Sequence, residues 1–279
     1  MAISTPTRPA VTSEPIRITS SAQRRRMPLG LRDRLLAVAT PLALLAVWEV
    51  LARAAVIDTR FFPAPTDIFA QLVTLATTGE LWSHMAVSLR RLALGFVVGV
   101  IPGLFIGVAM GLFRPVRAAV KPLISGTYPI PKSALLPLIL LIFGLGETSK
   151  VAMVAIGVFY PVALNALTGV AQVAPIYYDV SKNFGASRWQ TFRTVAIPGA
   201  MPNIVTGIEL GAGLGLILIA IAEMVGAQSG LGFMIWNAWQ LYSVETMYVG
   251  LVVIALIGYA VSLLISYLGR LVTPWQTTR

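Results

Sequence analysis

The stretch that decides the fold is residues 92–113, LALGFVVGVIPGLFIGVAMGLF. It carries no charged residue, and because about 20 apolar residues span a bilayer as a helix, it predicts a transmembrane helix. Glycine recurs at every fourth position from Gly95 to Gly111 and so lies on one helix face. Since helices in lipid associate through close packing, this face is expected to contact another helix, as a static or a sliding contact. The packing residues expected here and in a later run are Gly99, Gly103, Gly107 and Gly211.

The composition extends this prediction to the whole chain. Of 279 residues, 57% are hydrophobic and only 11% charged, and the mean hydropathy is +0.80, which excludes a soluble globular domain. Apolar runs comparable to residues 92–113 occur at 35–52, 122–146, 150–172, 199–226 and 246–268. The sequence therefore predicts an all-α, polytopic membrane protein with six transmembrane helices. Pro129, Pro131 and Pro137 indicate that the third span is not one straight helix.

Several kinds of chemistry are excluded by composition. The chain has no cysteine and a single histidine, His84, so disulfides, thiolate metal sites, cysteine nucleophiles and histidine metal clusters cannot form. It also lacks the Gly-x-Ser-x-Gly and His-Glu-x-x-His patterns of hydrolases. We therefore predict no catalytic residue and no metal site, and an intramembrane enzyme is disfavoured.

The net charge of +10 arises from 21 Lys and Arg against 11 Asp and Glu. With the amino terminus inside, seven of the basic residues lie in residues 1–34, three in 114–121, three in 182–193 and two in 270–279, which leaves six elsewhere. Because positive residues favour the cytoplasmic side, this distribution predicts that both termini are cytoplasmic. It accounts for the charge without nucleic acid. Residues 1–34 are expected to be a disordered basic cytosolic tail and residues 35–275 the transmembrane domain.

The outer loop, residues 54–91, contains one amphipathic segment. Apolar residues recur at helical spacing from Ile68 to Ala76, and Thr66 precedes them as a plausible N-cap. We expect a short helix here, lying at the outer membrane interface or packing on the bundle.

The candidate charged residues within the predicted spans are Glu49, Lys132, Glu209 and Glu223. Glu209 and Glu223 are 14 residues apart and so share one helix face at depths about 21 Å apart. Intramembrane charges usually face a cavity or a partner, so Lys132, Glu209 and Glu223 are candidates for a substrate path or gate. The alternative is that Glu49 and Glu223 lie near the outer interface and Lys132 extends to the inner one.

A polar segment between the fourth and fifth spans, residues 174–193, has the sequence APIYYDVSKNFGASRWQTFR. Pro175 favours a helix start and Gly185 a left-handed helix end, and residues 186–194 favour a second helix before Pro198. Val180 and Phe184 lie four residues apart beside charged Asp179 and Lys182. This surface suits docking into a groove on another protein, although a helix lying on the membrane has a similar composition.

At these residues the sequence resembles the permease subunits of bacterial ATP-binding-cassette (ABC) importers. Their signature is Glu-Ala-Ala, three residues, Gly, nine residues, Ile, one residue, Leu-Pro. Here Asp179-Val180-Ser181 is followed at the same spacing by Gly185, Val195 and Ile197-Pro198, with Asp-Val-Ser replacing Glu-Ala-Ala. Within the family the chain is similar to the nitrate, sulfonate and taurine branch over residues 61–275. The matching stretches are 131–138, 143–147, 185–189, 222–226 and 229–233.

The resemblance implies a MetI-like permease fold in the bacterial inner membrane and a division of labour among chains. Two ATPase subunits would carry ATP and Mg and dock on residues 175–194, and no cofactor is expected on this chain, which lacks Gly-x-x-x-x-Gly-Lys-Ser/Thr. The implied ATPase-coupling residues are Asp179, Val180, Ser181, Lys182, Phe184, Gly185, Ala186 and Arg188.

The resemblance also implies two further partners, a second permease chain, expected to be identical, and an extracytoplasmic solute-binding protein. The implied solute is a small anion such as a sulfonate, taurine or nitrate, for which Lys132 would supply favourable charge and the glutamates a gate or structural partners. A proton-coupled secondary transporter that uses Glu209, Glu223 and Lys132 as a relay is the alternative.

Overall fold

The computed structural model describes residues 30–275, and within this range every regular element is helical. The bounds are α1 Leu31–Arg53, α2 Pro65–Thr77, α3 Glu80–Leu112, α4 Arg114–Thr127, the 3₁₀ turn η1 Lys132–Leu135, α5 Leu136–Phe143, α6 Glu147–Gln172, α7 Pro175–Asn183, α8 Arg188–Thr191, the π turn η2 Phe192–Ala196, α9 Ile197–Met224, α10 Leu231–Gln240 and α11 Val244–Val272. Residues 1–29 of the predicted tail lie outside the described residues. Residues 31–34, also expected in the tail, form the first turn of α1 instead.

Membrane-spanning helices agree with the predicted runs. Among the described residues, five helices are long and apolar enough to cross a bilayer: Leu35–Arg53, α3, α6, the continuous helix Arg188–Met224, and α11. The predicted third span consists of α4 followed by η1 and α5, with a bend of 90° between them. Pro129 and Pro131 lie between α4 and η1 and cannot donate backbone hydrogen bonds, so the helix breaks there. With this bent pair counted, residues 30–275 contain up to six spans.

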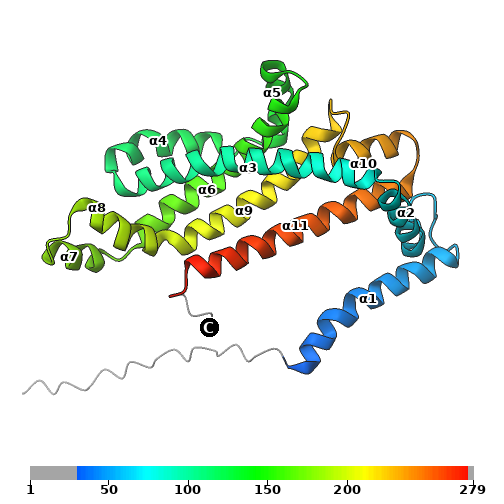
Figure 1. The fold of residues 1–279 in the computed structure, drawn as a ribbon, viewed down its shortest axis with the longest axis horizontal. Helices are drawn as coiled ribbons and strands as arrows, with labels where there is room; N and C mark the ends of the chain where they lie inside the picture. Colours follow the sequence, from blue (N-terminus) through cyan, green and yellow to red (C-terminus); the bar gives the residue numbers. More distant parts are fainter. Residues whose placement is uncertain (1–29, 276–279) are drawn as a thin grey trace, which may run out of the picture.

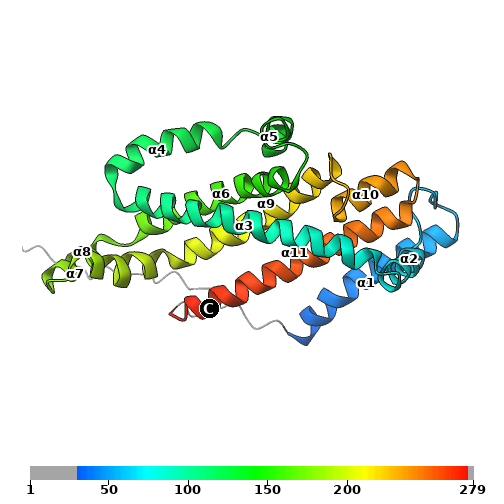
Figure 2. The ribbon, with the colours of Figure 1, turned by 45° about the horizontal axis from the view of Figure 1, so that its top comes forward.

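The core of the bundle is formed by α3, α6 and α9, which run side by side (Figures 1 and 2). The glycine stripe of α3 allows this close approach, since a Cβ added at Gly107 would lie 2.4 Å from the carbonyl oxygen of Ala163 on α6. Gly99 and Gly103 likewise face α6. From the other side, Gly211 of α9 contacts Val158 of α6. The four predicted packing glycines therefore join helices of one chain.

The two ends of the bundle carry different elements. The short helices α7 and α8 lie at one end, while α2, α10 and the beginning of α3 lie at the opposite end (Figure 1). At the latter end α1 contacts α2 and then diverges from the bundle, so that its apolar side chains are largely exposed (Figure 1).

Helix α3 begins earlier than predicted. Residues 80–91, expected in the outer loop, are its first three turns, and Gly79 at φ +83° marks its start. No glycine or proline interrupts the chain between Gly79 and Gly95, so the helix continues through Arg90 and Arg91. The predicted span begins after Arg91 because a charged residue is unfavourable within a span. In the structure Glu223 neutralises the Arg91 guanidinium inside the protein, so the helix includes this residue.

The predicted amphipathic helix in the outer loop is confirmed as α2, but its capping residue is not. Ala64 occupies the N-cap position and Pro65 the first turn. Thr66 instead accepts a hydrogen bond from Arg53 and donates one to Glu49 at 2.8 Å, which joins α2 to α1.

Helix α10 was not predicted. Its signal is present in the sequence, since Leu231, Met234, Ile235 and Ala238 recur at helical spacing directly after Gly230, and all four are buried. Helix α10 packs on α9 and α11 at the end of the bundle opposite α7 and α8.

Candidate functional site

The segment joining α6 to α9 has the predicted helix-break-helix form. Pro175 is at the start of α7, which ends at Asn183. Gly185 has φ +71°, and its amide donates to the carbonyl of Lys182. The amide of Ala186 donates to the carbonyl of Ser181 at 3.0 Å, which completes a left-handed helix end of the kind that glycine permits.

The second short helix begins at a cap that the sequence analysis missed. The amide of Gln190 donates to the Ser187 hydroxyl, while the Ser187 amide donates to the Gln190 side chain at 2.7 Å. This reciprocal pair is a capping box, and its signal, Ser-x-x-Gln, is visible in the sequence. The Ser181 and Thr191 hydroxyls, 2.6 Å apart, connect the two helices.

The expected helix end before Pro198 is wrong. Helix α8 passes through the π turn η2 directly into α9, giving one continuous helix from Arg188 to Met224. Pro198 lacks the amide proton of a regular turn, and the π turn immediately before it changes the hydrogen-bond pattern so that the helix continues. In the described residues, no loop therefore separates α8 from α9.

The exposed surface of this segment is largely apolar. Phe184 is 87% exposed, Trp189 67% and Val180 44%, and the charged side chains of Asp179, Lys182 and Arg188 are exposed beside them. Burial raises the pKa of the Tyr178 phenol above its ordinary value, so this side chain stays neutral. An exposed apolar patch with charges of both signs is suited to docking on another protein. We call the surface of residues 175–194 the docking segment.

A buried ionic cluster lies at the opposite end of the bundle. The Arg91 guanidinium, 3% exposed, donates to Glu223 of α9 at 2.9 Å and to Glu147 of α6. Glu223 is 1% exposed and also accepts a hydrogen bond from Ser88 at 2.7 Å. Together these contacts tie α3, α6 and α9 to one another at the end of the bundle opposite α7 and α8. We call Ser88, Arg91, Glu147 and Glu223 the outer cluster.

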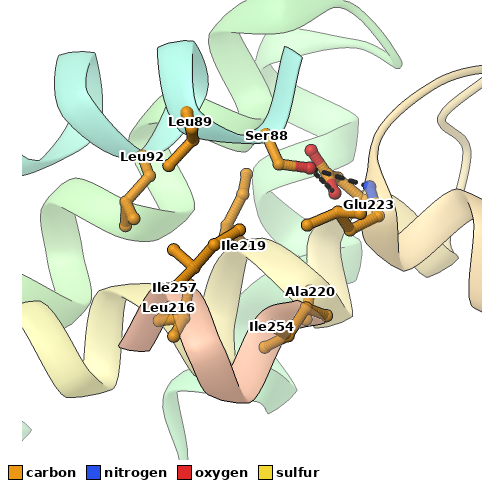
Figure 3. Close-up of a pocket in the computed structure, with 10 residues that line it drawn as sticks. Ser88, Leu89, Leu92, Leu216, Ile219, Ala220, Glu223, Ile254 and Ile257 are labelled. Atoms are coloured by element: carbon orange, nitrogen blue, oxygen red, sulfur yellow. Dashed lines mark hydrogen bonds between the residues drawn. The ribbon is translucent and has the colours of Figure 1, made fainter. Parts of the chain in front are cut away.

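The same cluster holds the start of α10, and Lys150 holds the loop before it. The amide of Gly232 donates to Glu223 at 3.0 Å, and Leu231 donates to the Ser88 hydroxyl. Lys150, 1% exposed, donates to the carbonyls of Leu145 and Gly226. Figure 3 shows Ser88 pointing toward Glu223 above a pocket with room for about one water molecule. The lining of the pocket is otherwise apolar, and includes Leu92, Leu216, Ile219 and Ile257.

Lys132 lies at the bend between α4 and α5. Its ammonium donates to the backbone carbonyls of Thr127, Tyr128 and Ile130 at 2.9–3.0 Å. It also lies 4.1 Å from the centre of the Tyr160 ring, a cation–π contact with α6. These contacts satisfy carbonyl groups freed by the break in the helix.

Glu209 is half-buried on α9 and faces α11. It accepts hydrogen bonds from Ser262 at 2.8 Å and from Ser266 at 3.1 Å. The three predicted path residues thus make their contacts with different parts of the chain: Lys132 with the α4–α5 bend, Glu209 with α11, and Glu223 with Arg91. Arg91, Ser88 and Glu147 were not among the predicted site residues, because only the fold shows that Arg91 and Ser88 contact Glu223 and that Glu147 contacts Arg91.

In the described residues, no group of three or more His, Asp or Glu side chains is placed to hold a metal ion.

Known proteins are similar in sequence to this chain along most of its length. The taurine transport system permease protein TauC of Escherichia coli is 37% identical over 256 residues, covering 90% of this chain and 93% of that protein. The putative aliphatic sulfonates transport permease protein SsuC of Bacillus subtilis is 30% identical over 238 residues, covering 85% of this chain and 86% of that protein. Such permeases are transport components rather than enzymes.

The fold is shared with solved transporters. The structure described as an amino acid ABC transporter with histidines matches with a TM-score of 0.56 and 25% identity, over 73% of this chain and 97% of that one. The family described as the binding-protein-dependent transport system inner membrane component matches residues 99–277, which include the docking segment. The chain therefore belongs to this family of ABC permeases, in the branch that transports nitrate, sulfonates and taurine.

Proposed function

We propose that this protein is the permease of an ATP-driven importer that moves a small sulfonate, with a taurine-like solute as the best fit, from an extracytoplasmic binding protein into the cytosol. An ABC importer for solutes of the taurine, sulfonate or nitrate type is the coarser function that the family gives. The taurine permease is 37% identical to this chain, and this supports the finer assignment.

The observation that carries the proposal is the exposed docking segment. Phe184 and Trp189 present apolar surface at the extreme end of the bundle, and α8 continues into a helix that crosses the membrane. In the proposed mechanism, two ATPase subunits bind the docking segments of two permease chains and move them when ATP binds. ATP can shift the transporter between states only if these contacts differ between the states.

The proposed orientation places α7, α8 and both termini in the cytosol. The α10 end, with the outer cluster, then faces the solute-binding protein on the other side of the membrane. The excess of Lys and Arg in segments on the α7–α8 side supports this orientation.

Reconstitution into liposomes tests the proposal. The complex of this chain with its ATPase and binding protein is expected to take up 2-aminoethanesulfonate (taurine) only when ATP is enclosed on the ATPase side and binding protein is present outside. Uptake that runs on a proton gradient without nucleotide would contradict it. In that case the proton-coupled alternative, which the family match does not favour, would apply.

A further inference from the structure

Glu209 is a carboxylate deep within the membrane-spanning part of the bundle. It lies 12 residues after the start of α9 and 15 before its end, so about 18–22 Å of helix separates it from either end. A charged group at this depth is costly in lipid, and it usually pairs with an opposite charge or faces water.

No such pairing is present for Glu209. Three other carboxylates of the long helices lie beside an arginine: Glu49 pairs with Arg53, and Glu147 and Glu223 pair with Arg91. Within residues 30–275, Glu209 forms no ion pair, and both of its hydrogen bonds, from Ser262 and Ser266, go to Oε1. The second oxygen, Oε2, has no donor in the described part of the chain.

The position of Glu209 allows contact with a solute. The side chain is half-buried where α9 contacts α11, so part of it remains accessible at the surface of the chain. Both serines donate to Oε1, so Oε2 remains available to a further donor. Because an ionised carboxylate is unfavourable against lipid, this surface is best explained as part of a water-filled path.

We propose that Glu209 contacts a cationic group of the transported solute, so that the solute is a small zwitterion carrying an ammonium as well as an anionic group. This inference rests on the proposed function and narrows its substrate class. A fixed negative charge repels a simple anion such as nitrate and attracts an ammonium that can donate to Oε2. The ammonium end of an aminosulfonate supplies that donor.

Access to water is tested by labelling, which is direct because the chain contains no cysteine. In the assembled transporter, built with cysteine-free partner subunits, the Glu209→Cys variant should react with a charged, water-soluble methanethiosulfonate reagent. Binding protein loaded with 2-aminoethanesulfonate should slow this reaction. The matched control is Leu44→Cys on the apolar helix α1, where we expect no reaction. An unreactive thiol at position 209 would overturn the proposal.

Selectivity is tested with Glu209→Gln. The amide oxygen still accepts from both serines, so the contact with α11 is kept while the charge is lost. With saturating loaded binding protein, uptake of 2-aminoethanesulfonate should fall by about tenfold or more, and uptake of ethanesulfonate should change by less than about twofold. Glu49→Gln, which alters a carboxylate already paired with Arg53, should affect the two solutes equally.

Other outcomes contradict the inference. Equal losses for both solutes in Glu209→Gln would assign Glu209 to helix packing, and an unchanged rate would remove its role. Wild-type transport of ethanesulfonate but not of 2-aminoethanesulfonate would also overturn it. If the wild type shows no ATP-dependent uptake of either solute, the proposed function fails instead, while thiol labelling still reports water access at position 209.

Discussion

Single residues of the docking segment can be tested because Gly185 has a specific conformational role. At φ +71° a β-branched side chain is strained by about 1–2 kcal/mol, although no atom lies within 4 Å of its Cβ position. Gly185→Val should therefore distort the turn between α7 and α8 and uncouple ATP hydrolysis from uptake, while the protein still inserts. The measurement is the ratio of ATPase rate to uptake in proteoliposomes.

The control at this position is Gly185→Asn, because asparagine tolerates the left-handed conformation better than most residues. We expect it to retain most of the coupling. If Gly185→Val couples as well as the wild type, the docking assignment of residues 175–194 is wrong.

The buried pair of Arg91 and Glu223 gives a prediction for stability. Removing one partner of a buried ion pair weakens the compensation of the other charge. Glu223→Gln should lower the free energy of unfolding by about 1–3 kcal/mol, because Arg91 would lose this partner but keep Glu147. Thermal unfolding of the purified protein in detergent measures this change.

The control for this stability measurement is the pair of Asp58 and Arg60, whose side chains are both exposed. Asp58→Asn should leave the unfolding temperature unchanged, because exposed pairs contribute little. Equal unfolding temperatures for Glu223→Gln and Asp58→Asn would show that the outer cluster does not hold the helices together.

Whole helices depend on the glycine stripe of α3. A Cβ at position 107 would lie 2.4 Å from a backbone oxygen of α6, which no side-chain movement can relieve. Gly107→Ala should therefore separate α3 from α6 and destabilise the protein by about 1–3 kcal/mol. Gly126→Ala on α4, where nothing lies within 4 Å, should be neutral or stabilising. Both variants are compared by their unfolding temperatures, and the same result for both would contradict tight packing at the stripe.

The α4–α5 bend is stabilised by Lys132, which is also a predicted residue of the substrate path. The Lys132 ammonium binds three backbone carbonyls, so Lys132→Ala leaves them without a donor from this side chain. We expect slower uptake with unchanged affinity of the binding protein for its solute. Uptake assays and isothermal titration of the isolated binding protein check the two parts of this prediction, and normal uptake would remove Lys132 from the transport path.

The orientation of the whole molecule is open to a direct test, because single cysteines can be introduced into a chain that has none. Asn183→Cys at the α7 end and Gln240→Cys at the α10 end are both exposed. A membrane-impermeant maleimide should label the first only in inside-out vesicles and the second only in right-side-out vesicles. Labelling of both from one side would contradict the proposed topology.

Native mass spectrometry of the complex should show two permease chains.

The spans, the two short helices within residues 175–194 and the family were all predictable from local pattern. Hydropathy over residues 92–113 indicates a span because the bilayer acts on about 20 residues at once, and Gly185 indicates a helix end because the chain needs a positive φ there. Likewise, the prolines after α4 predict a break, since a missing amide is a property of the residue itself.

Contacts between distant residues required the tertiary structure. Arg91 was placed in a loop because a charge within a span is unfavourable, yet Glu223, 132 positions later, neutralises it. Similarly, Glu209 and Glu223 are indistinguishable by sequence as carboxylates on one helix, but α11 provides only hydroxyls to the first and α3 provides a guanidinium to the second. The free energy of an intramembrane charge depends on which groups surround it, and those groups come from helices that only packing brings together.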